Sequence, residues 1–126
     1  MTWKIDLKDD FGAVQVSCSG KLSMDDMVMM VIEAGFLARQ NDYRNILFDL
    51  TDAAMIFPAE QLGILLDSYA ECGIPLTTRT ALVVSTQDVP KDLSRLLATA
   101  RERGYQVDLL IDRQQAENWF SNMPDR

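Results

Sequence analysis

Three aspartates stand at positions where a metal site would be expected. Asp52, Asp88 and Asp112 each follow a segment that resembles a buried strand. If those strands run parallel, their carboxyl ends meet at one edge of a sheet, where gathered carboxylates would bind Mg²⁺. Asp88 and Asp112 also stand where helix N-caps belong, and a cap stabilises a helix by about 1 kcal/mol without any metal. We favour the caps and expect neither a metal ion nor a cofactor.

The residue types exclude several classes of enzyme. The chain has no histidine, which rules out a Ser-His-Asp triad, a Cys-His pair and a histidine-bound zinc. Neither phosphate-cradling motif, GxxxxGK[ST] or GxGxxG, occurs. Cys72 precedes Gly73 at a predicted helix C-terminus, where the negative end of the helix dipole raises a thiol pKa. We therefore expect no enzymatic activity.

The elements that position these residues begin with a hairpin. Apolar and polar residues alternate over 3–8 and again over 14–19, and the turn residues of 9–12 lie between them. Gly20 is expected to end the second strand. Ser23 and Asp26 resemble a capping box, which predicts that a helix begins at Met24.

The rest of the chain alternates helices with short apolar strands. In order, the predicted elements are a helix over Met24–Gln40, a strand over Ile46–Leu50, a helix over Pro58–Glu71, a strand over Ala81–Val84, a helix over Pro90–Arg103, a strand over Val107–Ile111 and a short helix through Trp119 and Phe120. The order ββαβαβαβα predicts an α/β fold: a mixed, mostly parallel five-stranded sheet with an N-terminal hairpin and about four helices.

The size and charge of the chain limit the classes of partner that we expect it to bind. The 126 residues, 48% of them hydrophobic, suit one domain over 1–126. Twelve basic against 19 acidic residues give a net charge of −7, which repels nucleic acid and anionic lipid, so neither nucleic acid nor membrane insertion is expected. The chain has no run of about 18 apolar residues and no secretory leader pattern, and its two cysteines are far apart. We expect a cytoplasmic protein.

Two stretches resemble a known family. They are GKLS at Gly20–Ser23 and ILFDLTDA at Ile46–Ala53. With the order of elements and the corner at Phe57 and Pro58, they make nearly the whole chain similar to the STAS domain, the fold of bacterial anti-sigma-factor antagonists (SpoIIAA-like proteins). The resemblance implies a regulatory protein that binds other proteins.

The serine switch of that family has no counterpart here. In the antagonists, the loop after this strand carries an Asp-Ser-Ser/Thr-Gly signature whose serine is phosphorylated at a helix N-terminus, where an anion is favoured. The matching stretch here, residues 56–60, reads IFPAE and contains no phosphate acceptor. Thr51 is the nearest hydroxyl, and we expect it to bond to backbone; whether it is ever modified stays open.

The segment Ala53–Phe57 is apolar where connecting loops are normally polar. Ile56 or Phe57 would pack on the next helix as a hydrophobic staple, or the segment would line an apolar pocket or docking patch at the carboxyl end of a strand. Exposure of Met55 and Phe57 separates these interpretations. The candidates for ligand or partner binding are Thr51, Asp52, Met55, Ile56 and Phe57.

The helix over Met24–Gln40 is apolar on more than one side. Four residues would suffice to cover a sheet: Met27, Val31, Ala34 and Ala38. Four more widen the apolar surface and are candidates for an interface: Val28, Met29, Ile32 and Phe36. Either the following segments wrap this helix or a second chain does.

These observations predict a non-catalytic, STAS-like regulatory or protein-interaction module that lacks the serine phosphoswitch. Its partner would be another protein or a second copy of itself, as a homodimer. The alternative is a carrier or sensor of a small hydrophobic, lipid-like ligand held beside Ala53–Phe57. An enzyme that uses the carboxylates ranks third.

Overall fold

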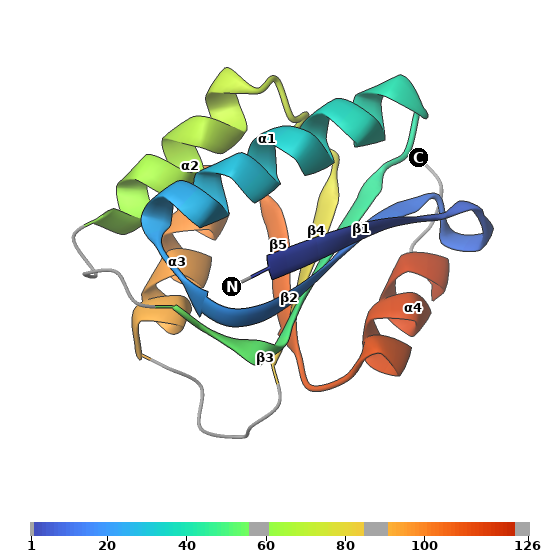
Figure 1. The fold of residues 1–126 in the computed structure, drawn as a ribbon. Helices are drawn as coiled ribbons and strands as arrows, with labels where there is room; N and C mark the ends of the chain where they lie inside the picture. The colour runs from blue at the N-terminus through green and yellow to red at the C-terminus, as the bar shows by residue number, and fades with distance from the viewer. Residues whose placement is uncertain (1, 56–60, 85–90, 123–126) are drawn as a thin grey trace.

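The computed structural model describes residues 2–55, 61–84 and 91–122, which form a five-stranded sheet covered on both faces (Figure 1). The elements are β1 (Thr2–Lys8), η1 (Asp9–Phe11), β2 (Ala13–Leu22), α1 (Met24–Gln40), β3 (Asn45–Met55), α2 (Leu62–Glu71), β4 (Arg79–Val83), α3 (Lys91–Glu102), β5 (Gln106–Leu110) and α4 (Arg113–Asn122). Helices α1, α2 and α3 cover one face and α4 covers the other. Among these residues, no helix is long and apolar enough to cross a bilayer.

The strands lie in the order β1-β2-β3-β4-β5. The β1–β2 pair is antiparallel and the other three pairs are parallel. The hairpin turns through η1 and Gly12, whose φ of 58° is the left-handed conformation that glycine adopts without strain. The predicted α/β fold with a mixed sheet is confirmed.

Helix α1 begins and ends where the sequence predicts. The Ser23 hydroxyl accepts a hydrogen bond from the backbone N–H of Asp26 at 3.2 Å. The carboxylate of Asp26 accepts one from the backbone N–H of Ser23 at 2.9 Å. This reciprocal pair satisfies two N–H groups that the helix leaves unpaired, so the capping box is confirmed.

The predicted ends of the second and third strands were wrong. β2 continues beyond Gly20 to Leu22, and β3 continues beyond Leu50 to Met55. The two extensions pair in parallel, with Gly20 opposite Ala53 and Leu22 opposite Met55. The residues 53–55 therefore belong to a strand, and not to the apolar loop that the sequence suggested.

A bulge in β3 explains why the sequence pattern hid this extension. Ser17 pairs with Asp49, but Ser19 pairs with Asp52, so β3 holds one residue more than β2 between these pairs. Leu50 lies in the core cluster and Ala53, an odd number of residues later, also packs against that cluster. The inward side thus changes from even to odd numbers, and the alternation that marks a strand is broken.

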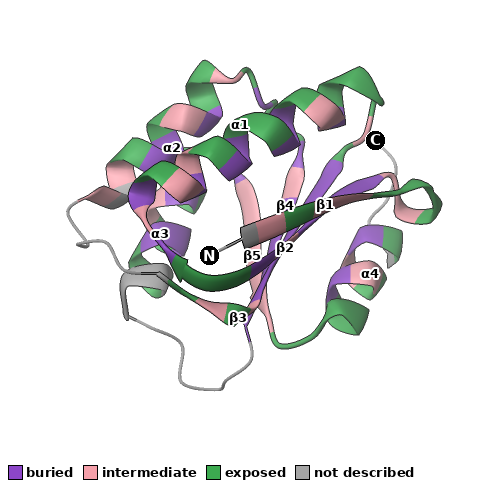
Figure 2. Ribbon diagram, in the orientation of Figure 1, coloured by how far each residue is buried: buried purple, intermediate pink, exposed green. Residues whose placement is uncertain are grey.

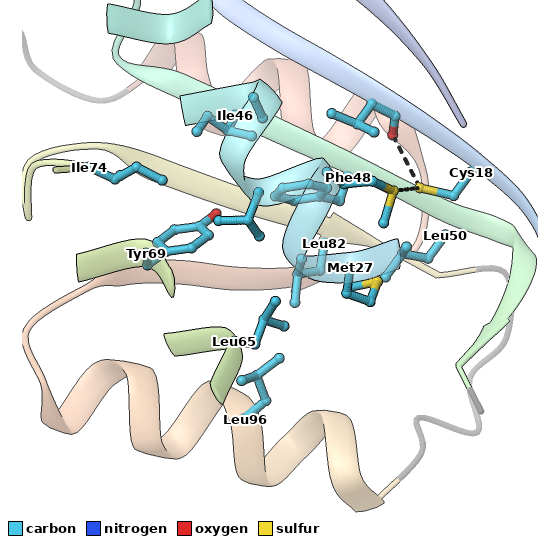
Figure 3. Packing of buried hydrophobic residues seen from close by; sticks show 14 of the residues in the cluster. Cys18, Met27, Ile46, Phe48, Leu50, Leu65, Tyr69, Ile74, Leu82 and Leu96 are labelled. Carbon is cyan, nitrogen blue, oxygen red and sulfur yellow. Dashed lines mark hydrogen bonds between the residues drawn. The ribbon is translucent and has the colours of Figure 1, made fainter. Parts of the chain in front are cut away.

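The larger core lies between the sheet and α1, α2 and α3 (Figure 3). Phe48 and Leu82 from the sheet meet Met27, Leu65 and Leu96 from the helices. A smaller cluster lies under α4, and its buried members are Ala13, Leu47, Ala81, Val83, Ala116 and Phe120. The inner sides of α1 and α2 thus pack in the larger core, and their outer sides face away from it.

Candidate functional site

The outer side of α1 carries an exposed apolar stripe. Met29, Ile32 and Phe36 are 50%, 45% and 55% exposed, respectively. They follow one another at three and four residues, the spacing that places side chains on one helix face. Figure 2 shows exposed positions along this outer side.

The inner side of α1 already fills the core. Its buried apolar residues are Met24, Met27, Met30, Val31, Ala34 and Ala38. Val28 is half-buried at the margin and packs against the same cluster. Of the four predicted interface residues, three therefore project outward and one belongs partly to the core. Within the described residues, the outer three side chains each remain about half exposed.

Helix α2 packs beside α1 and carries another exposed apolar side chain. A Cβ added to Gly35 would lie 3.1 Å from two carbons of Ile74 and 3.7 Å from the Cβ of Cys72, so α1 closely approaches the segment that ends α2. The two helices lie side by side (Figure 1) and run in the same direction, because each follows a parallel strand. Cys72 lies level with Gly35. Ile64, eight residues before Cys72, therefore lies level with the part of α1 that is about eight residues before Gly35. It is 49% exposed.

We call Met29, Ile32, Phe36 and Ile64 the α1–α2 face. Charged residues surround it: Asp25 and Glu33 are exposed on α1, and so is Arg39. Arg39 leans toward α2, because its Nη1 lies 3.0 Å from the position that a Cβ on Gly73 would take. An apolar centre with a charged rim is the arrangement typical of protein interfaces.

Thr51 has a structural partner. Its hydroxyl donates to Asp49 Oδ1 at 2.7 Å, and its backbone N–H donates to the same oxygen at 3.1 Å. The partner is thus a carboxylate, where the sequence predicted backbone. The other carboxylate oxygen, Oδ2, lies 3.4 Å from Nε of Arg113 at the start of α4. Asp49 therefore fastens the β3 bulge to the helix on the other face, and Asp52 beyond it is exposed.

The corner residues are only partly placed. Met55 ends β3, with its backbone paired to Leu22, while Ile56 and Phe57 lie outside the described residues. The exposure test that would separate a staple from a docking patch therefore stays open. Thr51 and Asp52 lie on β3, whereas the stripe lies on the outer side of α1.

An apolar cavity of about 40 Å³ lies inside the larger core. Its walls include Met27, Phe48, Leu65 and Tyr69, and the Tyr69 hydroxyl satisfies its hydrogen bonding with Thr80 at 3.1 Å. Ligand pockets for drug-sized molecules measure roughly 300–1,000 Å³. This cavity is too small for a lipid-like ligand.

The structure places one of the predicted helix caps and the Cys72 thiol. Asp112 caps α4, since its Oδ1 accepts a hydrogen bond from the N–H of Gln115 at 2.8 Å, as predicted. Asp88 lies outside the described residues. In the described ranges, no three acidic or thiol side chains converge as a metal would require. Burial raises the pKa of the Cys72 thiol, which confirms the predicted direction but adds a cause stronger than the charges around it.

Sequence reasoning missed two members of this region. Ile64 stands in the apolar run 64–66, where residue type does not distinguish it from its buried neighbours Leu65 and Leu66. Its period-3.6 position relative to Leu65 and Tyr69 would have indicated an outward direction. Asp49 interrupts the apolar run Ile46–Leu50, and no local pattern indicated its contacts with Thr51 and Arg113.

Comparison with known proteins supports the fold and not a closer relationship. No protein-family model matches the chain, and no curated protein does either. Among solved structures, the anti-sigma factor antagonist SpoIIAA in its unphosphorylated form is similar over 97% of this chain and 100% of its own, with a TM-score of 0.60 and 13% identity. The Bacillus cell fate determinant SpoIIAA in its phosphorylated form covers 94% of this chain and 99% of its own, with a TM-score of 0.58 and 12% identity. The chain therefore has the SpoIIAA-like, or STAS, fold.

Proposed function

We propose that this protein is a non-catalytic regulatory module of the cytoplasm that binds another polypeptide through the α1–α2 face. One observation carries the proposal. Met29, Ile32 and Phe36 are each about half exposed on a helix whose opposite side already fills the core. About half of each of these three large apolar side chains is left uncovered by the described residues.

The energetics favour a covered stripe. Removing apolar surface from water yields roughly 25 cal/mol per Å². Contiguous exposed apolar patches on soluble proteins commonly mark interaction sites. Methionine and phenylalanine suit such a site, since both are enriched in interface cores and methionine adapts to irregular surfaces. A partner that covers the α1–α2 face would remove these apolar side chains from water, and this removal would contribute to the free energy of binding.

The fold is consistent with this role. The SpoIIAA structures are described as an anti-sigma factor antagonist and a cell fate determinant, and one of them is phosphorylated. Residues 56–60 of this chain offer no hydroxyl for phosphorylation. We infer that binding here is regulated without a serine switch in that segment.

A carrier of a hydrophobic ligand ranks second. The cavity of about 40 Å³ accommodates no lipid-like molecule, and Tyr69 and Thr80 are already paired in its wall. An enzyme that used its carboxylates to hold a metal ion would need several of them together, and in the described ranges no three acidic or thiol side chains converge.

A capture experiment with matched variants tests the proposed function. Immobilised wild-type protein would be exposed to lysate, and bound proteins would be identified by mass spectrometry. Ile32→Glu places a charge within the stripe and keeps a good helix former. Ile111→Glu is the control, because Ile111 is 52% exposed at the β5–α4 connection, away from the stripe.

A partner that depends on the face is then purified and titrated against each variant by calorimetry. We expect Ile32→Glu to weaken its binding by tenfold or more and Ile111→Glu to leave it within twofold. Equal binding by both variants contradicts the proposal.

A further inference from the structure

On the outer side of α1, residues of complementary type stand at similar distances before and after Ile32. Asp25 lies seven residues before Ile32, and Arg39 lies seven residues after it. Met29 lies three residues before Ile32, and Phe36 four residues after it. The surface thus carries an acid at one end, a base at the other, and apolar residues between them.

Such a pattern complements itself when two copies of the helix lie antiparallel. Asp25 of one copy then faces Arg39 of the other, and Met29 faces Phe36. The two Ile32 side chains meet at the two-fold axis. An interface that uses the same patch on both subunits is the isologous type found in most symmetric dimers.

We propose that the partner of the α1–α2 face is a second copy of this chain, docked by antiparallel pairing of the two α1 helices about Ile32. The inference rests on the proposed function, because it names the occupant of the same face. Charge complementarity between Asp25 and Arg39 distinguishes this occupant from an unrelated protein.

The neighbouring helix sets the direction of docking. Ile64 is half exposed on the neighbouring α2, and Arg39 leans toward the same helix, over Gly73. Glu33 lies on the opposite flank, almost half a helix turn away from Gly35, which faces the segment that ends α2. A partner helix shifted toward α2 therefore gains Ile64 and keeps the two Glu33 carboxylates apart.

Net charge does not prevent this association. Each copy carries −7. The Debye length at physiological ionic strength is about 8 Å, so repulsion between distant charges is largely screened while contacts within the interface are not. Four half-exposed apolar side chains from each copy form a small interface, of the size that gives transient dimers. We expect dissociation in the micromolar range.

Sedimentation equilibrium over a range of concentrations tests the dimer. Wild type should show a monomer–dimer equilibrium. Ile32→Glu puts two like charges at the two-fold axis and should raise the dissociation constant at least tenfold, whereas Ile111→Glu should leave it unchanged. Circular dichroism spectra that match wild type show that each variant is folded.

Thiol cross-linking tests the orientation. Met29→Cys and Phe36→Cys are prepared separately in a Cys72→Ser background, and the remaining Cys18 is buried. After mixing and mild oxidation, antiparallel pairing predicts that disulfides join mainly Met29→Cys to Phe36→Cys. Self-linked dimers of each variant in place of mixed dimers would overturn the antiparallel arrangement.

The outcomes separate this inference from the function on which it rests. A chain that stays monomeric at all concentrations, yet binds a different protein that Ile32→Glu releases, refutes the dimer and leaves the proposed function standing. A monomeric chain with no partner sensitive to Ile32→Glu refutes both. A dimer that Ile111→Glu disrupts and Ile32→Glu does not would place the interface elsewhere and refute the inference.

Discussion

Asp49 Oδ1 accepts two hydrogen bonds from Thr51, one from its backbone N–H at 3.1 Å and one from its hydroxyl at 2.7 Å. The contact closes over the bulge that separates the pairs Ser17–Asp49 and Ser19–Asp52. The Asp49 carboxylate thus accepts a hydrogen bond from a backbone N–H at the point where the register between β3 and β2 shifts. The carboxylate thereby stabilises the extension of β3 that carries Ala53 onto the core.

Replacing Thr51 tests this role. Thr51→Val keeps the β-branched shape but removes the hydroxyl, and hydrogen bonds to charged acceptors contribute more than neutral ones. We expect the free energy of unfolding to fall by about 1–2 kcal/mol. Urea denaturation measures the change. Thr51→Ser, which keeps the hydroxyl, should lose less than half as much; equal losses would show that the hydroxyl is not the stabilising group.

The Cys18 thiol makes stability depend on alkaline pH. Burial and the nearby Asp49 carboxylate raise the pKa of Cys18 from 9.0 to about 12, and its sulfur contacts Met30 at 3.4 Å (Figure 3). Above the unfolded pKa, the unfolded chain has lost the proton that the folded chain retains. The unfolded state then binds fewer protons, so stability falls as the pH rises from about 9 toward 12 and is unaffected below that range.

Urea denaturation at a series of pH values checks this dependence. Between about pH 9 and 11, wild type should lose roughly 1 kcal/mol more per pH unit than Cys18→Ala, which has no thiol to titrate. Tyr69, whose pKa is also raised by burial, is present in both proteins and cancels in the comparison. Parallel pH curves would contradict the assignment to Cys18.

Two helical glycines should respond differently to alanine. A Cβ at Gly63 meets no atom of the described residues within 4 Å, so Gly63→Ala should raise the free energy of unfolding by up to about 1 kcal/mol through helix propensity. A Cβ at Gly35 would lie 3.1 Å from two carbons of Ile74, which is tight enough to offset that gain. Urea denaturation should rank Gly63→Ala above Gly35→Ala, and equal stabilities would show that α1 and α2 have room to separate.

Local signals in the sequence predicted most elements of the fold. The Ser23–Asp26 capping box and the apolar periodicity after it gave α1 its bounds, because both depend on residues within the helix itself. The end of β3 was not predictable in the same way. Its extension depends on pairing with Ser19–Leu22, more than 30 residues away in the chain, and on a bulge that reverses the alternation.

The candidate site was predicted in part for the same reason. The excess of apolar residues on α1 indicated that part of this helix faces something other than the sheet, and exposure of Met29, Ile32 and Phe36 agrees. The role of Val28 at the core margin and the contribution of Ile64 depend on how α2 packs against α1 at Gly35. No local pattern encodes that contact.

The most direct test of the α1–α2 face is a concentration series of ¹H–¹⁵N correlation spectra of the isotopically labelled protein. Association through this face predicts concentration-dependent shifts or broadening centred on Met29, Ile32, Phe36 and Ile64, with Ile111 unchanged. Spectra in which these four residues stay constant at every concentration, and also on addition of any protein captured by the wild type, would contradict the account.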